Sequence, residues 1–388
     1  MRSVAVMLLL ACAALSHAAG PVVQIVQLDG RVLRGELMTV VPELIVRNES
    51  ETFAGAWADI LELRVDAPPA TQPASQPGAD ESWWIELADG GLLHARLAES
   101  SERTLQFTSM LGAHSASLAQ LARLSRSPAP PDQSAPVATE DVCVIRRGET
   151  SAELRGRVLE FATDGVRFER SGRALLIPWQ RLMDLRTATA TAGRADPLRL
   201  HLRDGSQLVA RILGGDEQRL QLASRSLGDL ELDWSSLQRV EVRSQRVLFL
   251  SDLRPSDYQF QPFLAKRWPY TMDRDLRGRP LAVGGATYPR GVALHSESRL
   301  SFELGGIFEQ FAALAGIADA EAPRGNVTLR ILGDDRELWA AADVRGGASP
   351  LPVLVDVRGV QTLTLVVEFG ADLDLADHAV FAMARLLR

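Results

Sequence analysis

The sequence predicts an all-β protein in which four copies of one small β unit precede a larger β-sandwich. Two observations lead to this prediction. The first is a pattern that occurs four times: an alternating strand ends in a glycine turn, and a second alternating strand follows. The second is residues 247–388, where apolar and polar residues alternate between turn signals, as in half-buried sandwich strands. A chain of 388 residues is long enough for several such domains.

The first 18 residues have the features of an export signal. Arg2 supplies a positive charge, residues 4–15 form a short apolar core, and SHA at 16–18 offers small residues to a leader peptidase. The apolar core is too short to span a bilayer, and no second run of membrane length follows. The sequence therefore predicts an exported, periplasmic or extracellular protein without a membrane span. A lipid anchor on Cys12 is the alternative, because LLAC resembles a lipoprotein cleavage box.

Composition and missing motifs narrow the function. The chain has 42 Lys and Arg against 49 Asp and Glu, a formal net charge of −7. Nucleic acid needs clustered positive charge, so we exclude it as a partner. The sequence lacks G-x-S-x-G, H-E-x-x-H, a phosphate loop and C-x-x-C. Small β units occupy every segment and leave no room for a catalytic domain, so the sequence predicts a protein that is not an enzyme.

Cleavage after Ala18 would leave Cys143 as the only cysteine, which excludes an intrachain disulfide. Its context, VCVI, predicts a small buried side chain in a strand. A nucleophilic thiol would need a nearby base, and no histidine lies close in sequence.

The four repeats are aligned by a glycine near the first turn and by a closing motif. The glycines lie 57 to 60 residues apart, at Gly30, Gly90, Gly148 and Gly205. The closing motifs begin at Trp57, Leu118, Trp179 and Trp234. The apolar residues of these motifs are three apart, which is typical of a 3₁₀ turn that leads into a last strand. The predicted copies are 22–66, 82–126, 141–188 and 197–243.

Five short strands with a closing turn resemble an SH3-like or Sm-like small barrel. In such barrels a large aromatic residue at the closing turn usually fills the core. Linkers rich in Pro, Ala, Ser and Gln separate some copies, at 67–81 and 127–140. The third and fourth copies are expected to pack with the C-terminal module as one body, while the first two move on tethers.

Strands are expected over most of the C-terminal part. The candidates are 247–253, 291–304, 308–318, 326–333, 336–344, 351–357, 362–369 and 379–387. The turn signals between them include Gly305-Gly306, Gly333-Asp334 and Gly346-Gly347.

Five short motifs stand in order in this part: LSDL at 250–253, GVALHSES at 291–298, GIAD at 316–319, RGNV at 324–327 and DHA at 377–379. With these motifs it resembles the NPCBM family of carbohydrate-binding modules, which are β-sandwiches (jelly rolls) of the galactose-binding type. Two places depart from the family: Leu294 and Ser296 flank His295 where Gly and Ala are common, and Val380-Phe381 follows DHA where Trp is frequent. These changes put sugar binding in doubt while leaving the fold intact.

The resemblance and the local composition together select the site residues. The aromatic cluster at Trp268 and Tyr270 would offer a platform for a sugar ring, with polar groups nearby. The predicted carbohydrate-binding residues are Trp268, Tyr270, Asp273, Arg274, His295 and Asp335. The family motifs also mark Asp252, Asp319, Asp377 and His378, which are expected to hold the scaffold, because buried polar groups must be paired. No cofactor is predicted, and a structural Ca²⁺ stays open because carboxylates suit it.

The leading hypothesis is an exported, non-catalytic carbohydrate-binding protein that recognises a glycan or cell-envelope polysaccharide. The repeats would act as spacers or as modules that contact envelope proteins. The alternative is a bacterial-envelope scaffolding protein that has lost sugar binding.

Overall fold

The computed structural model describes residues 20–66, 82–100, 102–128, 139–188, 198–263, 266–371 and 373–388. Residues 1–18, with Cys12, and the linker 67–81 lie outside these ranges. Regular structure in the described residues consists of strands and four 3₁₀ turns of three residues each, so the predicted all-β class is confirmed. None of the described residues form a helix with the length and apolar character needed to cross a membrane.

The first two repeats have the expected order of strands. Those of the first repeat are β1 (Val22–Gln27), β2 (Val32–Thr39), β3 (Leu44–Arg47), β4 (Thr52–Gly55) and β5 (Ile60–Val65), with the 3₁₀ turn η1 (Trp57–Asp59) before β5. Those of the second are β6 (Ser82–Leu87), β7 (Leu92–Leu97), β8 (Thr104–Ser109), β9 (Gly112–Ser117) and β10 (Leu121–Ser125).

The third and fourth repeats follow the same order. The third contains β11 (Asp141–Arg147), β12 (Thr150–Ala162), β13 (Gly165–Arg170), β14 (Arg173–Pro178) and β15 (Leu182–Arg186). The fourth contains β16 (Leu198–Leu202), β17 (Gln207–Gly215), β18 (Arg219–Ser224), β19 (Gly228–Asp233), the 3₁₀ turn η2 (Trp234–Ser236) and β20 (Leu237–Val242).

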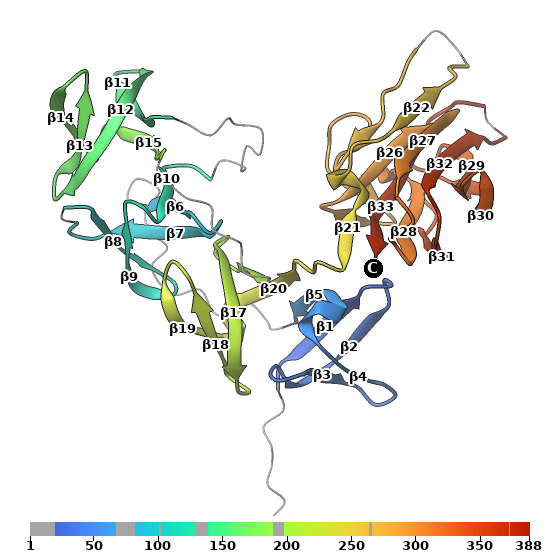
Figure 1. Ribbon diagram of the computed structural model, residues 1–388, viewed down its shortest axis with the longest axis horizontal. Helices are drawn as coiled ribbons and strands as arrows, with labels where there is room; N and C mark the ends of the chain where they lie inside the picture. The colour runs from blue at the N-terminus through green and yellow to red at the C-terminus, as the bar shows by residue number, and fades with distance from the viewer. Residues whose placement is uncertain are drawn as a thin grey trace, which may run out of the picture. The chain divides into compact units, whose positions relative to one another are not determined.

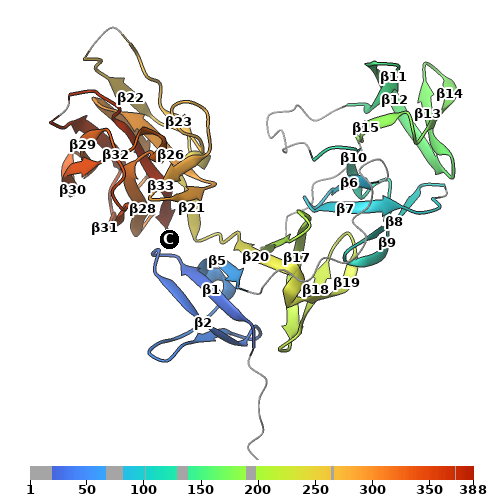
Figure 2. The ribbon, with the colours of Figure 1, turned by 180° about the vertical axis from the view of Figure 1, so that it is seen from behind.

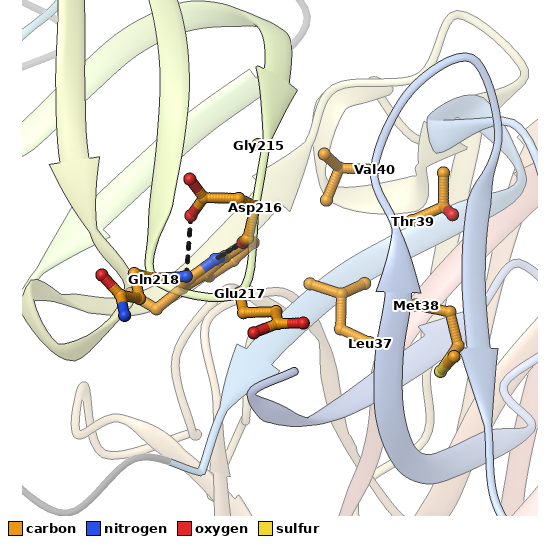
Figure 3. Close-up of a pocket in the computed structure, with 9 residues that line it drawn as sticks. Leu37, Met38, Thr39, Val40, Gly215, Asp216, Glu217 and Gln218 are labelled. Carbon is orange, nitrogen blue, oxygen red and sulfur yellow. Dashed lines mark hydrogen bonds between the residues drawn. The ribbon is translucent and has the colours of Figure 1, made fainter. Parts of the chain in front are cut away.

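The four marker glycines occupy the left-handed region, with φ between 61° and 94°. This confirms the predicted role, because only glycine enters that region without a steric cost. The closing aromatic residues differ from one another: Trp234 is buried, whereas Trp57 and Trp179 are half-buried. The Trp234 indole donates to the Asp216 carbonyl at 2.9 Å. Figure 3 shows the turn between β17 and β18, which contains Asp216. In this turn the Asp216 carboxylate accepts from the Gln218 amide at 2.8 Å.

The second and third repeats share one hydrophobic core. Their closing strands β10 and β15 pair antiparallel, with Leu124 opposite Leu185 (Figure 1). Leu124, Leu185 and the thiol-bearing Cys143 are fully buried in the common core. An ion pair between Arg123 and Asp184 crosses the same strand pair. The expectation that the second repeat moves on its own tether is therefore wrong, because its last strand completes a sheet with the third repeat.

The chain forms two compact units. The first unit contains the third repeat and the fourth repeat up to residue 241. The second unit contains residues 242–388 together with two segments of the first repeat, 25–32 and 57–62. The expectation that these two repeats form one body with the C-terminal module is therefore also wrong.

The C-terminal module is a sandwich of two antiparallel sheets (Figures 1 and 2). One sheet has the order β23-β26-β33-β28-β31, with β21 (Val247–Phe249) also paired to β33. Its strands are β23 (Thr271–Met272), β26 (Gly291–His295), β33 (His378–Leu387), β28 (Gln310–Ile317) and β31 (Leu351–Asp356). The other sheet contains β22 (Asp257–Phe260), β27 (Ser298–Glu303), β32 (Thr362–Phe369), β29 (Asn326–Gly333) and β30 (Arg336–Arg345).

Apolar side chains from both sheets fill the space between them, among them the fully buried Phe302, Phe311 and Phe381. Three short elements complete the module: the hairpin of β24 (Leu281–Val283) and β25 (Ala286–Tyr288), and the 3₁₀ turns η3 (Leu250–Asp252) and η4 (Asp319–Glu321).

The single strand predicted at 291–304 is two strands in different sheets. β26 ends at His295, and β27 begins at Ser298 in the opposite sheet. The Ser296 hydroxyl donates to Asp377 at 2.6 Å, and the Glu297 carboxylate accepts from the Phe369 amide at 3.1 Å. These bonds hold the crossing between the sheets, so the polar residues at 296–297 mark a corner within an otherwise apolar pattern.

Candidate functional site: an aromatic and histidine cluster at one end of the sandwich

Two histidines meet at one end of the sandwich because their strands are neighbours. His295 is the last residue of β26, His378 is the first of β33, and the two are opposite each other in the antiparallel register. Their ring centroids are 5.4 Å apart, with the planes at 63°. Both residues are buried.

Trp268 completes an aromatic cluster with these two rings. Its indole stacks on His295 with centroids 5.3 Å apart and planes at 7°, and it meets His378 edge-on at 4.7 Å. The Tyr258 hydroxyl donates to the Trp268 carbonyl at 2.6 Å, which fixes the loop. Trp268 is half-buried. It is therefore neither a core residue nor a fully exposed platform, because the two histidine rings contact the indole while part of it stays open to solvent.

Glu321 lies at the base of the cluster, on the turn η4. Its Oε1 is 3.5 Å from His378 Nδ1, and the two side chains are 2% and 3% exposed. Neither atom has a hydrogen bond of good geometry among the described residues, but Oε1 forms an ion pair with Arg277, whose Nη2 lies 2.9 Å away. Arg277 donates to the other oxygen, Oε2, at 3.2 Å. A buried polar atom usually has a partner, so His378 Nδ1 is the atom of this pair that is left for a bound hydroxyl group.

Burial keeps both imidazoles neutral at neutral pH. Desolvation lowers the pKa of His378 from its ordinary 6.5 to about 4, and the nearby His295 and Arg277 act in the same direction, while Asp275 opposes them. Burial also lowers the pKa of His295, against the effect of the Ser296 carbonyl 2.5 Å from Nδ1. A neutral imidazole has one donor and one acceptor, which is the pattern that a sugar hydroxyl requires.

The sandwich is expected to lose stability as the pH falls through the window from about 6.5 to 4. In that window the unfolded chain binds a proton on the residue-378 imidazole that the folded chain does not, so lower pH favours unfolding. The full shift corresponds to at most about 3 kcal/mol. Calorimetry of the full chain at several pH values should show the sandwich transition falling in this range. Equal slopes for the wild type and His378→Gln would contradict this assignment.

The remaining motif residues hold loops of the sandwich: Asp377 and Asp319 lie near the cluster, and Asp252 lies at the other end of β26. Asp377 is fully buried and accepts from the Ser296 hydroxyl at 2.6 Å and from the Asn326 amide at 3.0 Å. Asp319 accepts from the Gly285 amide at 2.9 Å. Asp252 pairs with Arg290 at 2.8 Å.

Four other sequence candidates do not join the cluster. Tyr270 packs against the core, edge-on to Tyr258. Asp273 accepts from the Gly291 amide at 2.9 Å, and Arg274 donates to the Gly278 carbonyl at 3.1 Å. Asp335 lies in the turn between β29 and β30, at the opposite end of β29 from Asn326. Its side chain is 93% exposed. Of the six predicted binding residues, the structure brings only Trp268 and His295 together, with His378 beside them.

Sequence reasoning missed Lys266, Arg277 and Glu321. Lys266 places its Nζ 3.5 Å from the centroid of the Trp268 ring. It is the only lysine of the chain and lies two residues before Trp268, a signal that could have found it. Glu321 and Arg277 stand in ordinary loop sequence, and only the tertiary fold places them here.

The described residues include no group of three or more His, Cys, Asp or Glu side chains arranged to hold a metal ion. Cys143 is free and buried, as predicted, and burial raises the pKa of its thiol to about 12. A thiolate nucleophile is therefore not available there.

Known proteins resemble parts of this chain. A curated protein of Renibacterium salmoninarum, named "Putative endo-alpha-N-acetylgalactosaminidase", is 32% identical over 90 residues, which are 23% of this chain and 6% of that protein. Among solved structures, the CBM51 of a Clostridium perfringens GH95 protein, in complex with methyl-galactose, is 22% identical. The match covers 36% of this chain and 99% of the CBM51 chain, with a TM-score of 0.34.

The tandem CBM51 modules of a family 98 glycoside hydrolase from Streptococcus pneumoniae are 11% identical. The match covers 94% of this chain and 88% of the tandem-module chain, with a TM-score of 0.33. The comparison with known families agrees with the resemblance in the motifs: residues 246–387 match the NPCBM/NEW2 domain.

Proposed function

We propose that the C-terminal sandwich binds a glycan at the cluster of Trp268, His295 and His378. The observation that supports this most is the half-buried Trp268 ring, which stacks on a parallel imidazole and lies next to His378, whose buried Nδ1 has no hydrogen-bond partner among the described residues. The open part of the indole would pack against the C–H face of a sugar ring. The neutral imidazoles and Glu321 would bind the hydroxyl groups, whose recognition makes such a site specific.

The proposed protein is exported and non-catalytic, in the periplasm or outside the cell. The repeats at 22–66, 82–126, 141–188 and 197–243 would be SH3-like or Sm-like barrels that act as spacers or contact envelope proteins. Asp273, Arg274 and Asp335 are less favourable as sugar ligands than the cluster, because the first two already serve loop contacts and the third lies in a distant turn.

One feature of the third repeat favours envelope scaffolding as a second candidate function. Leu175 and Leu176 are 42% and 47% exposed on β14, which pairs only with β13 among the described strands. In the fourth repeat, Leu230 at the position that matches Leu175 is buried, and the exposed Glu231 stands where the third repeat has Leu176. An exposed apolar edge strand is a surface on which another chain can add a strand.

A glycan array probed with the full chain, with and without Ca²⁺, tests the first candidate. We expect a restricted set of glycans to bind, and Ca²⁺ dependence would reveal a structural ion. No binding under either condition would contradict glycan recognition. Capture of envelope proteins that Leu176→Glu abolishes and free sugars do not displace would favour scaffolding.

A further inference from the structure

The ring that would receive a sugar already carries a cation. Lys266 Nζ lies 3.5 Å from the centroid of Trp268. Lys266 is exposed, and no carboxylate in the described part of the chain pairs with it within ion-pair distance. An ammonium over an indole face gains only a modest cation–π attraction in contact with water. It therefore remains available for a stronger partner.

Three arginines lie next to the cluster, and carboxylates already pair with them. Arg277, Arg279 and Arg324 all lie within 4 Å of the Glu321 carboxylate, at 2.9, 3.8 and 3.9 Å. Arg279 also pairs with Asp275 at 2.8 Å. Each of these arginines therefore has a carboxylate partner, whereas Lys266 is a cation beside the cluster that no described carboxylate pairs with.

We infer that the glycan bound here is an acidic sugar, whose anionic group pairs with Lys266; the inference rests on the proposed function. A neutral sugar that stacked on Trp268 would have to displace the ammonium and gain nothing from it. A sugar with a carboxylate or sulfate would instead form a charge-assisted hydrogen bond with it. The hydroxyl groups of the same sugar would face His295, His378 and the Glu321 carboxylate.

Three methyl glycosides that differ only at carbon 6 separate this inference from glycan binding in general. They are those of galactose, galacturonic acid and galactose 6-sulfate, titrated calorimetrically against the full chain. We expect at least one acidic sugar to bind about tenfold more tightly than galactose, because a charged hydrogen bond is stronger than a neutral one. High salt should reduce that preference. The two acidic sugars distinguish a carboxylate from a sulfate ligand.

Variants at Lys266 complete the test. Lys266→Gln should reduce the ratio of acidic to neutral affinity to about one, whereas Lys266→Arg should keep most of it. Arg336→Gln is the matched control, since Arg336 is an exposed cation at the other end of the sandwich, and it should keep the full ratio. Equal binding of all three sugars, or a ratio that Lys266→Gln does not change, would overturn the inference and leave glycan binding intact. Binding of none would overturn the inference, and a glycan array without any bound glycan would overturn glycan binding as well.

Discussion

Replacing Trp268 with alanine is expected to lower glycan affinity by at least about 30-fold, the loss typical of a central aromatic residue in a binding site. The substitution removes the surface for the sugar ring and the indole that covers His295 and His378. Trp268→Phe should retain part of the affinity, because a smaller ring can still stack. Isothermal titration of the full chain with a glycan identified on the array measures the effect.

Trp339 provides the matched control for this substitution. It is half-buried like Trp268, but it lies on β30 in the second sheet and packs against the sandwich core. Trp339→Ala should therefore reduce the thermal midpoint of the sandwich and leave affinity close to that of the wild type. If Trp268→Ala and Trp339→Ala reduced affinity equally, the loss would reflect general destabilisation, and the proposed site would be wrong.

Removing the Asp377 carboxylate is expected to destabilise the sandwich by about 3–5 kcal/mol. Asp377→Ala leaves the Ser296 hydroxyl and the Asn326 amide without their buried acceptor. For a domain of this size the loss corresponds to a decrease of about 10 °C in the midpoint of the sandwich transition. Differential scanning calorimetry of the full chain measures it.

Asp377→Asn and Asp335→Ala test the cause of that loss. Asparagine keeps one oxygen for the Asn326 amide, and the Ser296 hydroxyl can rotate to accept from the new amide group, so less than half of the loss is expected. Asp335 is exposed, so Asp335→Ala should change stability by less than about 0.5 kcal/mol. An unchanged midpoint for Asp377→Ala would show that this carboxylate does not hold the crossing between the sheets.

Local patterns predicted the strands well where one physical rule acts along a short segment. Gly205 follows aspartate at the end of an alternating strand and has the positive φ that a tight turn requires. The strand at 326–333 coincides with β29 because its alternation reflects one buried face. The short strand β22 was missed, since four residues with half-exposed side chains carry little periodic signal.

The predicted binding site was only partly correct, because its residues come from separate strands and loops. The motif marked His295 and His378, but it did not show that β26 and β33 pair in the register that brings the two rings together. Tyr270 is close to Trp268 in sequence, yet it turns toward the core. Neighbouring positions in sequence do not determine which side chains share a surface.

The sequence by itself determined the all-β class, the glycine turns, most strand positions and the likeness to the NPCBM family. Each of these depends on local alternation, turn geometry or a linear motif. Only the tertiary structure decided that the second and third repeats share a core, that the chain changes sheets at Ser296, and that Lys266 and Glu321 join the histidine cluster. The reason is that strand pairing and loop packing bring together residues far apart in sequence, and no local pattern records which partners meet.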